Sequence, residues 1–331
     1  MKKLMLMVVA ATILLSGCGG GVNRNAPEPD KETTINTKTE EEEERTMRYK
    51  TEEIAQALLD QDYEGIYGQL SSDFKEQFTL EKFRDTIGGL LKDVTAWTAA
   101  STLKLNEFNY YTWIDQTGAF GLKLGSLPDD EIVSLQIIPL QQFPATDSAK
   151  TKHEYALPFK NEWFVFWGGE NVLANYHYEY DVQRYAYDLI QVKDDYSYNG
   201  DPTKNESYYA FGQEIVAPRE GTVVRVVNDI EDNEPVGTMN ADHPEGNVVV
   251  IDHGDGEYSF LAHMKKGSVV VNVGDHVQKG DLLGLCGNSG NSSEAHLHFQ
   301  VSDNPDLFEG TAIRVNWENG LSPKQGETLK P

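Results

Sequence analysis

Five histidines are the strongest chemical signal in this chain of 331 residues. His177, His253, His263, His296 and His298 lie within or beside segments that read as β-strands. His296 and His298 are two residues apart, so in a strand both imidazoles project from the same face. Neutral imidazole is a common metal ligand and a general base near neutral pH. The pair therefore indicates a metal or acid–base site, although a pair of this spacing is more often structural when it stands alone.

The strands that would position these histidines come from residues 149–331. Short apolar runs in this region are broken by Gly, Asp and Asn at turn positions, a pattern that predicts an all-β antiparallel sandwich or barrel. His263 ends one such strand, and a polar loop leads from Gly287 to His296. His253 stands in a turn before Gly254, where a hydrogen-bonding structural role is favoured over metal ligation.

An ordered series of motifs makes this region recognisable. The motifs are the segments 246–254, 261–263, 273–280, 287–290 and 296–299. The series resembles the lysostaphin/LytM type of zinc metallopeptidase, a group of peptidoglycan endopeptidases. The resemblance implies a lysostaphin-like fold, a Zn²⁺ cofactor and a peptidoglycan or related peptide substrate. It also implies that His298 is a zinc ligand and that His263 and His296 are catalytic, acting on the substrate and the attacking water. Asn247, in the first motif, is predicted to bind substrate.

The remaining two zinc ligands are less clear. The family usually supplies them from a His-x-x-x-Asp motif near the start of the domain, but here Arg184 precedes Asp188 by four residues. Arginine stays protonated and cannot bind a cation. We predict that His177 reaches the site from the preceding strand and acts with Asp188, leaving Arg184 free to bind a substrate carboxylate. Two alternatives stay open: His177 with Asp181, and no intact metal site.

The N-terminus indicates export and lipid anchoring. Residues 1–18 read as a lipoprotein signal peptide, with two lysines, a short apolar run and Cys18 as the lipidated residue. Residues 19–47 are polar and acidic and predict a disordered tether. The protein is therefore expected on the outer face of the cytoplasmic membrane, held by its N-terminal lipid, in a cell envelope of the Gram-positive kind.

Residues 48–148 predict a small α+β accessory domain, because helical spacing of apolar residues gives way to alternation from Leu103 onward. The full chain carries 53 acidic and 28 basic residues, so nucleic acid is not an expected partner. The sequence thus predicts a zinc-dependent endopeptidase in residues 149–331. The alternative is a catalytically impaired module of the same fold that binds peptidoglycan or activates a hydrolase.

Overall fold

The computed structural model describes residues 49–331. The predicted signal peptide, Cys18 and the acidic tether lie outside the described residues. Between residues 49 and 331, no helix has the length and apolar character needed to cross a membrane.

The N-terminal domain begins with a layer of short helices. Three of them start at a side-chain cap, where Asp62, Ser71 and Thr79 each accept a backbone N–H three residues on, at 3.1 to 3.3 Å. The helices are η1 (Thr51–Glu53), α1 (Ile54–Leu59), α2 (Tyr63–Gln69), α3 (Ser72–Gln77) and α4 (Leu80–Leu91).

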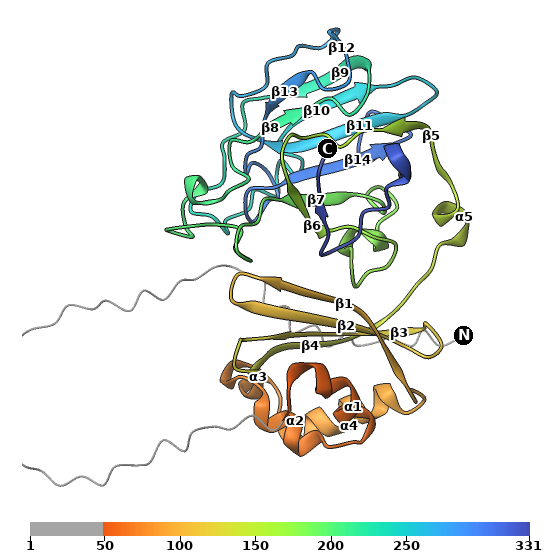
Figure 1. Cartoon of the computed structure of the whole chain (residues 1–331), viewed down its shortest axis with the longest axis vertical. Helices are drawn as coiled ribbons and strands as arrows, with labels where there is room; N and C mark the ends of the chain where they lie inside the picture. The colour runs from red at the N-terminus through yellow and green to blue at the C-terminus, as the bar shows by residue number, and fades with distance from the viewer. Residues whose placement is uncertain (1–48) are drawn as a thin grey trace, which may run out of the picture.

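These helices cover one face of a four-stranded antiparallel sheet, whose other face is turned toward the C-terminal domain (Figure 1). The strands, in spatial as in chain order, are β1 (Trp97–Leu105), β2 (Phe108–Asp115), β3 (Phe120–Ser126) and β4 (Ile132–Pro139). Leu122 and Leu124 of β3 pack with Phe83 and Ile87 of α4 in one buried cluster. The predicted small α+β domain is confirmed.

The C-terminal domain is built on a ten-stranded sheet in which the pairs are antiparallel, except that β5 and β15 run parallel. Eight strands follow the order β12-β9-β10-β11-β14-β7-β6-β16, and β15 joins β14 to β5. The strands of this sheet are β5 (Lys150–Tyr155), β6 (Trp163–Trp167), β7 (Tyr187–Ile190), β9 (Gly221–Val227), β10 (Asn247–Asp252), β11 (Tyr258–Met264), β12 (His276–Val277), β14 (Leu297–Ser302), β15 (Ala312–Trp317) and β16 (Thr328–Leu329).

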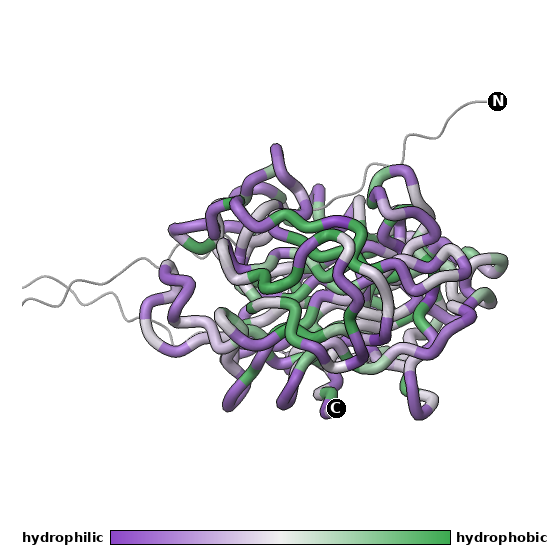
Figure 2. The backbone as a smooth tube through the Cα atoms, turned by 90° about the horizontal axis from the view of Figure 1, so that it is seen from above, coloured by the Kyte–Doolittle hydropathy of each residue, from purple (hydrophilic) through white to green (hydrophobic). Residues whose placement is uncertain are grey.

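A second, two-stranded sheet packs on the first and closes the core. It pairs β8 (Glu214–Val216) with β13 (Leu282–Leu285). Ile215 and Leu283 from this sheet share one buried cluster with Leu261 and Phe299 from the large sheet. Figure 2 shows that segments of hydrophobic residues run through the interior, whereas the loops that project outward consist mostly of hydrophilic residues. The predicted all-β, lysostaphin-like architecture is confirmed.

Short helices complete the domain and its connection to the N-terminal sheet. Arg314 Nη1 donates to the carbonyl of Asp147, which ties the connecting helix to β15. The helices are α5 (Pro144–Asp147), η2 (Tyr176–Glu179), η3 (Asn205–Ser207) and η4 (Glu318–Gly320).

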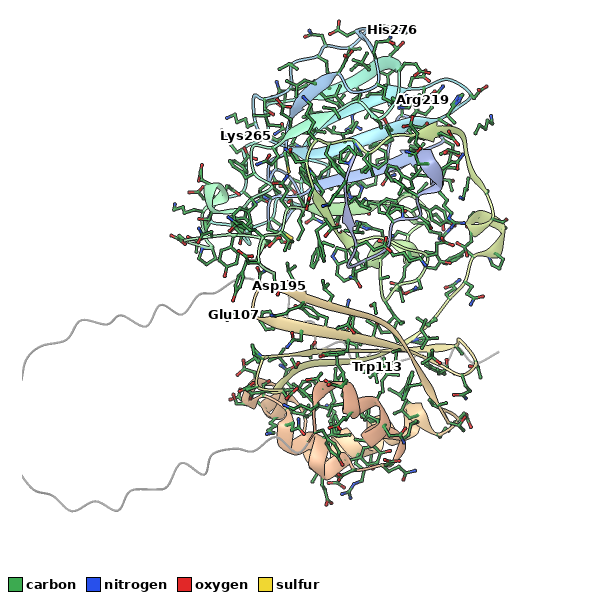
Figure 3. The ribbon with its side chains drawn as sticks, viewed as in Figure 1. Glu107, Trp113, Asp195, Arg219, Lys265 and His276 are labelled. Atoms are coloured by element: carbon green, nitrogen blue, oxygen red, sulfur yellow. The ribbon has the colours of Figure 1, made fainter. Side chains whose placement is uncertain are left out.

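The two domains touch at the turn between β1 and β2. Asn106 N–H donates to the carbonyl of Asp195 at 2.7 Å, and Lys104 pairs with the Asp195 carboxylate at 3.0 Å. Figure 3 shows Glu107 of this turn beside Asp195 at the edge where the domains meet. The N-terminal domain is therefore docked on the C-terminal domain through these polar contacts and through a buried cluster of Leu103 and Leu105 with Ile190.

Two glycines allow a close crossing of loops behind the histidine strands. A Cβ at Gly246 would lie 2.3 Å from the carbonyl oxygen of Ser289, and a Cβ at Gly290 would lie 2.3 Å from the nitrogen of Gly246. Both glycines have positive φ, 61° and 83°. Only glycine fits such an approach without strain.

This crossing predicts unequal effects of alanine at two glycines of similar conformation. Gly246→Ala and Gly254→Ala both place alanine at positive φ (61° and 83°), which costs roughly 1–2 kcal/mol. At Gly254 nothing lies within 4 Å of the new methyl group, so we expect about 1 kcal/mol. At Gly246 the Ser289 backbone must also move, so we expect about 3 kcal/mol. Urea unfolding measures both losses, and equal losses would contradict the close approach.

Candidate metal centre

The carboxylate of Asp188 lies at the centre of a histidine cluster. β7 and β14 are neighbours in the sheet, and Asp188 stands opposite His298. Asp188 Oδ1 is 3.0 Å from His298 Nδ1, and Asp188 Oδ2 is 3.6 Å from His177 Nε2. One ligand atom from each of the three residues lies within 4.8 Å of the others, and all three side chains are buried. The structure thus brings together the three residues predicted as metal ligands.

Their separations fit a small tetrahedral cation. With metal–ligand bonds of about 2.0–2.2 Å, two ligand atoms in a tetrahedral site lie roughly 3.4 Å apart. The nitrogen–oxygen distances, 3.0 Å to Oδ1 and 3.6 Å to Oδ2, lie on either side of that value, and one ligand atom from each residue lies within 4.8 Å of the other two. Two imidazoles and one carboxylate are a donor set that leaves a fourth position open for water or substrate.

His177 reaches the centre from a short helix, so the predicted strand is wrong. Asn175 directly precedes η2, and its side chain accepts the N–H of His177 at 3.2 Å and caps the helix. The same amide oxygen lies 2.8 Å from His177 Nδ1. Because the amide nitrogen of Asn175 donates to the carbonyls of Arg184 and Ala186, the amide orientation is fixed. The proton of His177 therefore sits on Nδ1, and Nε2 presents its lone pair to Asp188.

His298 is oriented from the opposite side by Gln300. The Gln300 side-chain nitrogen donates to the carbonyl of Val182 at 2.8 Å, so its oxygen faces His298 Nε2 at 3.0 Å. That contact keeps a proton on Nε2 and directs Nδ1 toward Asp188. A cation bound here would replace any proton shared between Nδ1 and the carboxylate.

His263 and His296 complete the cluster without belonging to the three-residue set. Their rings are 4.7 Å apart between centroids. His263 Nδ1 lies 2.8 Å from the carbonyl of Ser289, and His296 Nδ1 lies 2.8 Å from the carbonyl of Glu294. Each Nδ1 is thereby held as a donor. The Nε2 atoms stay available, and that of His296 is 3.6 Å from Asp188 Oδ1.

The electrostatics of the cluster keep the carboxylate ionised and one imidazole neutral. Burial raises the pKa of Asp188, but the electrostatic interactions with His177 and His296 and the hydrogen bond from His298 outweigh it and hold that pKa well below its usual range. Burial lowers the pKa of His177 to about 3 and also depresses the pKa of His263. Burial opposes the charged form of His298 too, but its hydrogen bond to Asp188 raises the net pKa. The ionised carboxylate and the neutral Nε2 of His177 are donors that a cation can bind directly, and at His298 the cation would replace the proton.

Arg184 does not face the centre, so its predicted role in substrate binding is not supported. The residue is 3% exposed. Its Nε donates to the carbonyl of Tyr178 at 3.0 Å, its guanidinium pairs with Asp181, and its Cζ lies 3.5 Å from the ring centroid of Phe143. Because the guanidinium is buried and already bonded within the protein, it is not available to bind a substrate carboxylate. Asp181, the alternative metal ligand, is turned outward to Arg184 with its side chain 74% exposed.

Asn247 is also a structural residue, and its prediction as a substrate-binding residue is corrected. The side chain is fully buried. It accepts the N–H of Ile230 and donates to the carbonyls of Ile230 and Met264, all at 2.8 to 2.9 Å. The amide is satisfied by backbone groups that join three segments, so no donor or acceptor is left for a substrate. His253 bonds the carbonyl of Glu220 and the hydroxyl of Ser259, which confirms its structural role.

The residues that orient the imidazoles escaped sequence reasoning. Gln300 carried a signal, because it follows His298 by two positions on the same strand face. Asn175 carried a weaker one, as a helix cap two residues before His177. Ser289 and Glu294 act through backbone carbonyls, which side-chain identity does not reveal.

Comparisons with known proteins agree with this geometry. The description "Peptidase family M23" matches residues 207–310, a stretch that contains His263, His296 and His298. The chain is 33% identical over 98 residues to the peptidoglycan DD-endopeptidase ShyA of Vibrio cholerae, covering 26% of this chain and 20% of that protein. It is 39% identical over 56 residues to an uncharacterized metalloprotease of Buchnera aphidicola, covering 17% and 14%. The chain therefore spans a fifth or less of the length of these relatives.

Solved structures show low overall similarity. The M23 metalloprotease pseudoalterin from the deep sea is 18% identical, with a TM-score of 0.32 over 55% of this chain and all of that one. The peptidase lysostaphin from Staphylococcus simulans is 18% identical, with a TM-score of 0.29 over 49% and 52%.

Residues 207–310 match peptidase family M23 and therefore form a LytM-type peptidase domain together with the strands around them. His177 and Asp188 precede the matched stretch, so the family match covers part of the candidate centre and the fold supplies the rest.

Gln300→Met should weaken metal binding because it removes the acceptor that fixes His298 while nearly keeping the volume. Loss of such an orienting partner typically costs 10–100-fold in metal affinity. Competition with a chromophoric chelator, with Zn²⁺ as the probe ion, measures the change. Gln325→Met is the matched control, since Gln325 is also buried but bonds the carbonyl of Phe166. Equal affinities in the two variants would argue against the orienting role.

Proposed function

We propose that this chain is a zinc-dependent endopeptidase that hydrolyses peptide bonds in peptidoglycan crosslinks or related peptides at the cell surface. The observation that carries the proposal is the centre around Asp188, in which two histidines can ligate a metal ion with the carboxylate and two more keep a free nitrogen beside it. The name of the Vibrio cholerae relative, a peptidoglycan DD-endopeptidase, supports the substrate class.

His177, Asp188 and His298 would hold the zinc ion. When bound, zinc would polarise a peptide carbonyl and lower the pKa of a water molecule at its open position to about 7. Arg184 in the usual histidine position does not disable this set, because His177 supplies the nitrogen from outside the strand. The donor set therefore favours the enzyme over a catalytically impaired binding module.

His263 and His296 would move protons. Each holds its Nδ1 proton toward a backbone carbonyl, so its Nε2 is the atom left for the reaction. One imidazole can accept a proton from the attacking water and pass it to the leaving amine. The other, when protonated, can stabilise the charge that develops on the carbonyl oxygen. Rates should therefore depend on both residues even when the metal is retained.

Alanine substitutions separate these roles. His177→Ala and His298→Ala should lose zinc, because each removes one of three ligands. His263→Ala and His296→Ala should keep zinc and slow turnover of a defined muropeptide roughly 100-fold or more. Zinc content by mass spectrometry and the rate of product release are the two measurements.

His276→Ala is the control for these variants. His276 is exposed at the far end of the domain, bonded to Thr222, and should change neither readout (Figure 3). Stoichiometric zinc in His177→Ala would show that the first ligand is assigned wrongly. A parent protein that binds no zinc and cleaves no muropeptide would favour the binding module.

The proposed location rests on the sequence of residues 1–47. A lipidated Cys18 followed by an acidic spacer would hold the peptidase on the outer face of the cytoplasmic membrane, within reach of the wall.

Cys18→Ser should abolish this anchoring. The parent should fractionate with membranes, whereas the variant should appear in the medium or keep its signal peptide, because serine offers no thiol for acylation. Fractionation with intact-mass measurement distinguishes the forms. A parent protein that is soluble and unacylated would contradict the anchor.

A further inference from the structure

We infer that the N-terminal domain contributes to the metal affinity of the centre. Gly121 and Lys123 of β3 position the loop that leads to His177. The inference rests on the proposed zinc site. It gives the N-terminal domain, to which the sequence assigned no chemistry, a role in metal affinity.

The loop in question, residues 168–175, joins β6 to η2. It is internally braced: Asn171 Oδ1 accepts the N–H groups of Leu173 and Ala174, and Gly168 N–H donates to the carbonyl of Ala174. Asn175 at its end holds His177 Nδ1 at 2.8 Å. A shift of this loop therefore moves the ligand.

Leu173 anchors the loop in a gap that β3 leaves open. The leucine is 2% exposed. A Cβ at Gly121 would lie 2.6 Å from Leu173 Cδ1, well inside contact distance. The side chain thus occupies space that only glycine provides at this position of the strand.

Lys123, two residues further along β3, holds the same loop by its charge. Its Nζ donates to the carbonyl of Leu173 at 3.2 Å and lies 4.2 Å from the ring centroid of Trp167, in cation–π geometry. Burial lowers the pKa of Lys123 to about 8. Keeping an ammonium group in such a place is unfavourable unless its partners are fixed, so the contact specifies one position of the loop.

Aromatic contacts continue from Trp167 to the metal ligand. The ring of Trp167 meets that of Tyr176 edge-on at 5.5 Å, and Tyr176 lies over His177 with centroids 3.9 Å apart. Lys123 is therefore linked to His177 by two routes, through the Leu173 carbonyl along the loop and through the rings.

Next to the contact with β3, the loop has less support. A cavity of about 510 Å³ lies between the loop and the neighbouring strands β1 and β2, lined by Ser101 and Thr112 of the N-terminal sheet and by Glu170 and Lys324 of the C-terminal domain. In this chain the first ligand comes from η2, at the end of this loop, and not from the turn before β7 that carries Arg184. Such a ligand needs outside support, and β3 supplies it.

The test is zinc affinity in the full-length chain. Lys123→Met keeps the apolar stem and removes the ammonium group, so we expect the zinc dissociation constant to rise about tenfold. Because methionine also removes a buried charge, the thermal midpoint of the zinc-free protein should not fall, which separates positioning from general destabilisation. Lys123→Arg keeps a cation and a donor and should recover most of the affinity.

Lys104→Met is the matched control. Lys104 also bridges the domains, through its 3.0 Å ion pair with Asp195, but it contacts a different segment. The zinc affinity of the Lys104→Met variant should equal that of the parent. If Lys123→Met does not unfold cooperatively, Gly121→Ala replaces it, because the added methyl group displaces Leu173 and should cause the same loss.

Lys123→Met with the affinity of the parent, while His177→Ala still loses zinc, would overturn this inference and leave the proposed function intact. Zinc retained in His177→Ala would overturn both. A tenfold loss in Lys123→Met, with no loss in Lys104→Met, would support the inference.

Discussion

The buried carboxylate of Asp188 is the constraint on which the rest of the C-terminal domain depends. A carboxylate that is 4% exposed is costly to ionise without partners. Here four imidazoles surround it, brought by η2, by the end of β11 and by the start of β14. The charge draws together segments more than 100 residues apart, and that arrangement is also the one that would bind a cation.

Most of the polar groups around the histidine cluster orient the four imidazole rings through hydrogen bonds. Asn175, Gln300 and the carbonyls of Ser289 and Glu294 each occupy one nitrogen of one histidine. The close crossing at Gly246 and Gly290 places Ser289 where it can do so. Tautomers fixed in this way raise metal affinity, because no reorganisation is needed when the ion binds. The packing of these loops therefore contributes to the orientation of the histidine rings.

The sequence predicted the parts of this site that follow local rules. The spacing of His296 and His298 predicted their common face, alternation from Leu103 predicted the N-terminal sheet, and short apolar runs between turn residues predicted the C-terminal strands. Arg184 was misjudged because the sequence does not show that the guanidinium is buried against the Phe143 ring and paired with Asp181. Asn247 was misjudged because a polar residue at a strand end can face solvent or backbone, and here it faces backbone from two other segments. No pattern in the sequence links Gly121 to Leu173. Their contact depends on how the two domains dock, so only the structure reveals it.

The central claim is that a displaced histidine restores a three-ligand zinc site in an M23 domain with arginine at the usual position. Anomalous diffraction at the zinc absorption edge, on crystals of the zinc-loaded protein, tests this claim most directly. We expect a single strong peak within about 2.0–2.2 Å of His177 Nε2, a carboxylate oxygen of Asp188 and His298 Nδ1. A peak that lies away from His177, or the absence of any peak in the Asp188 cluster, would contradict it.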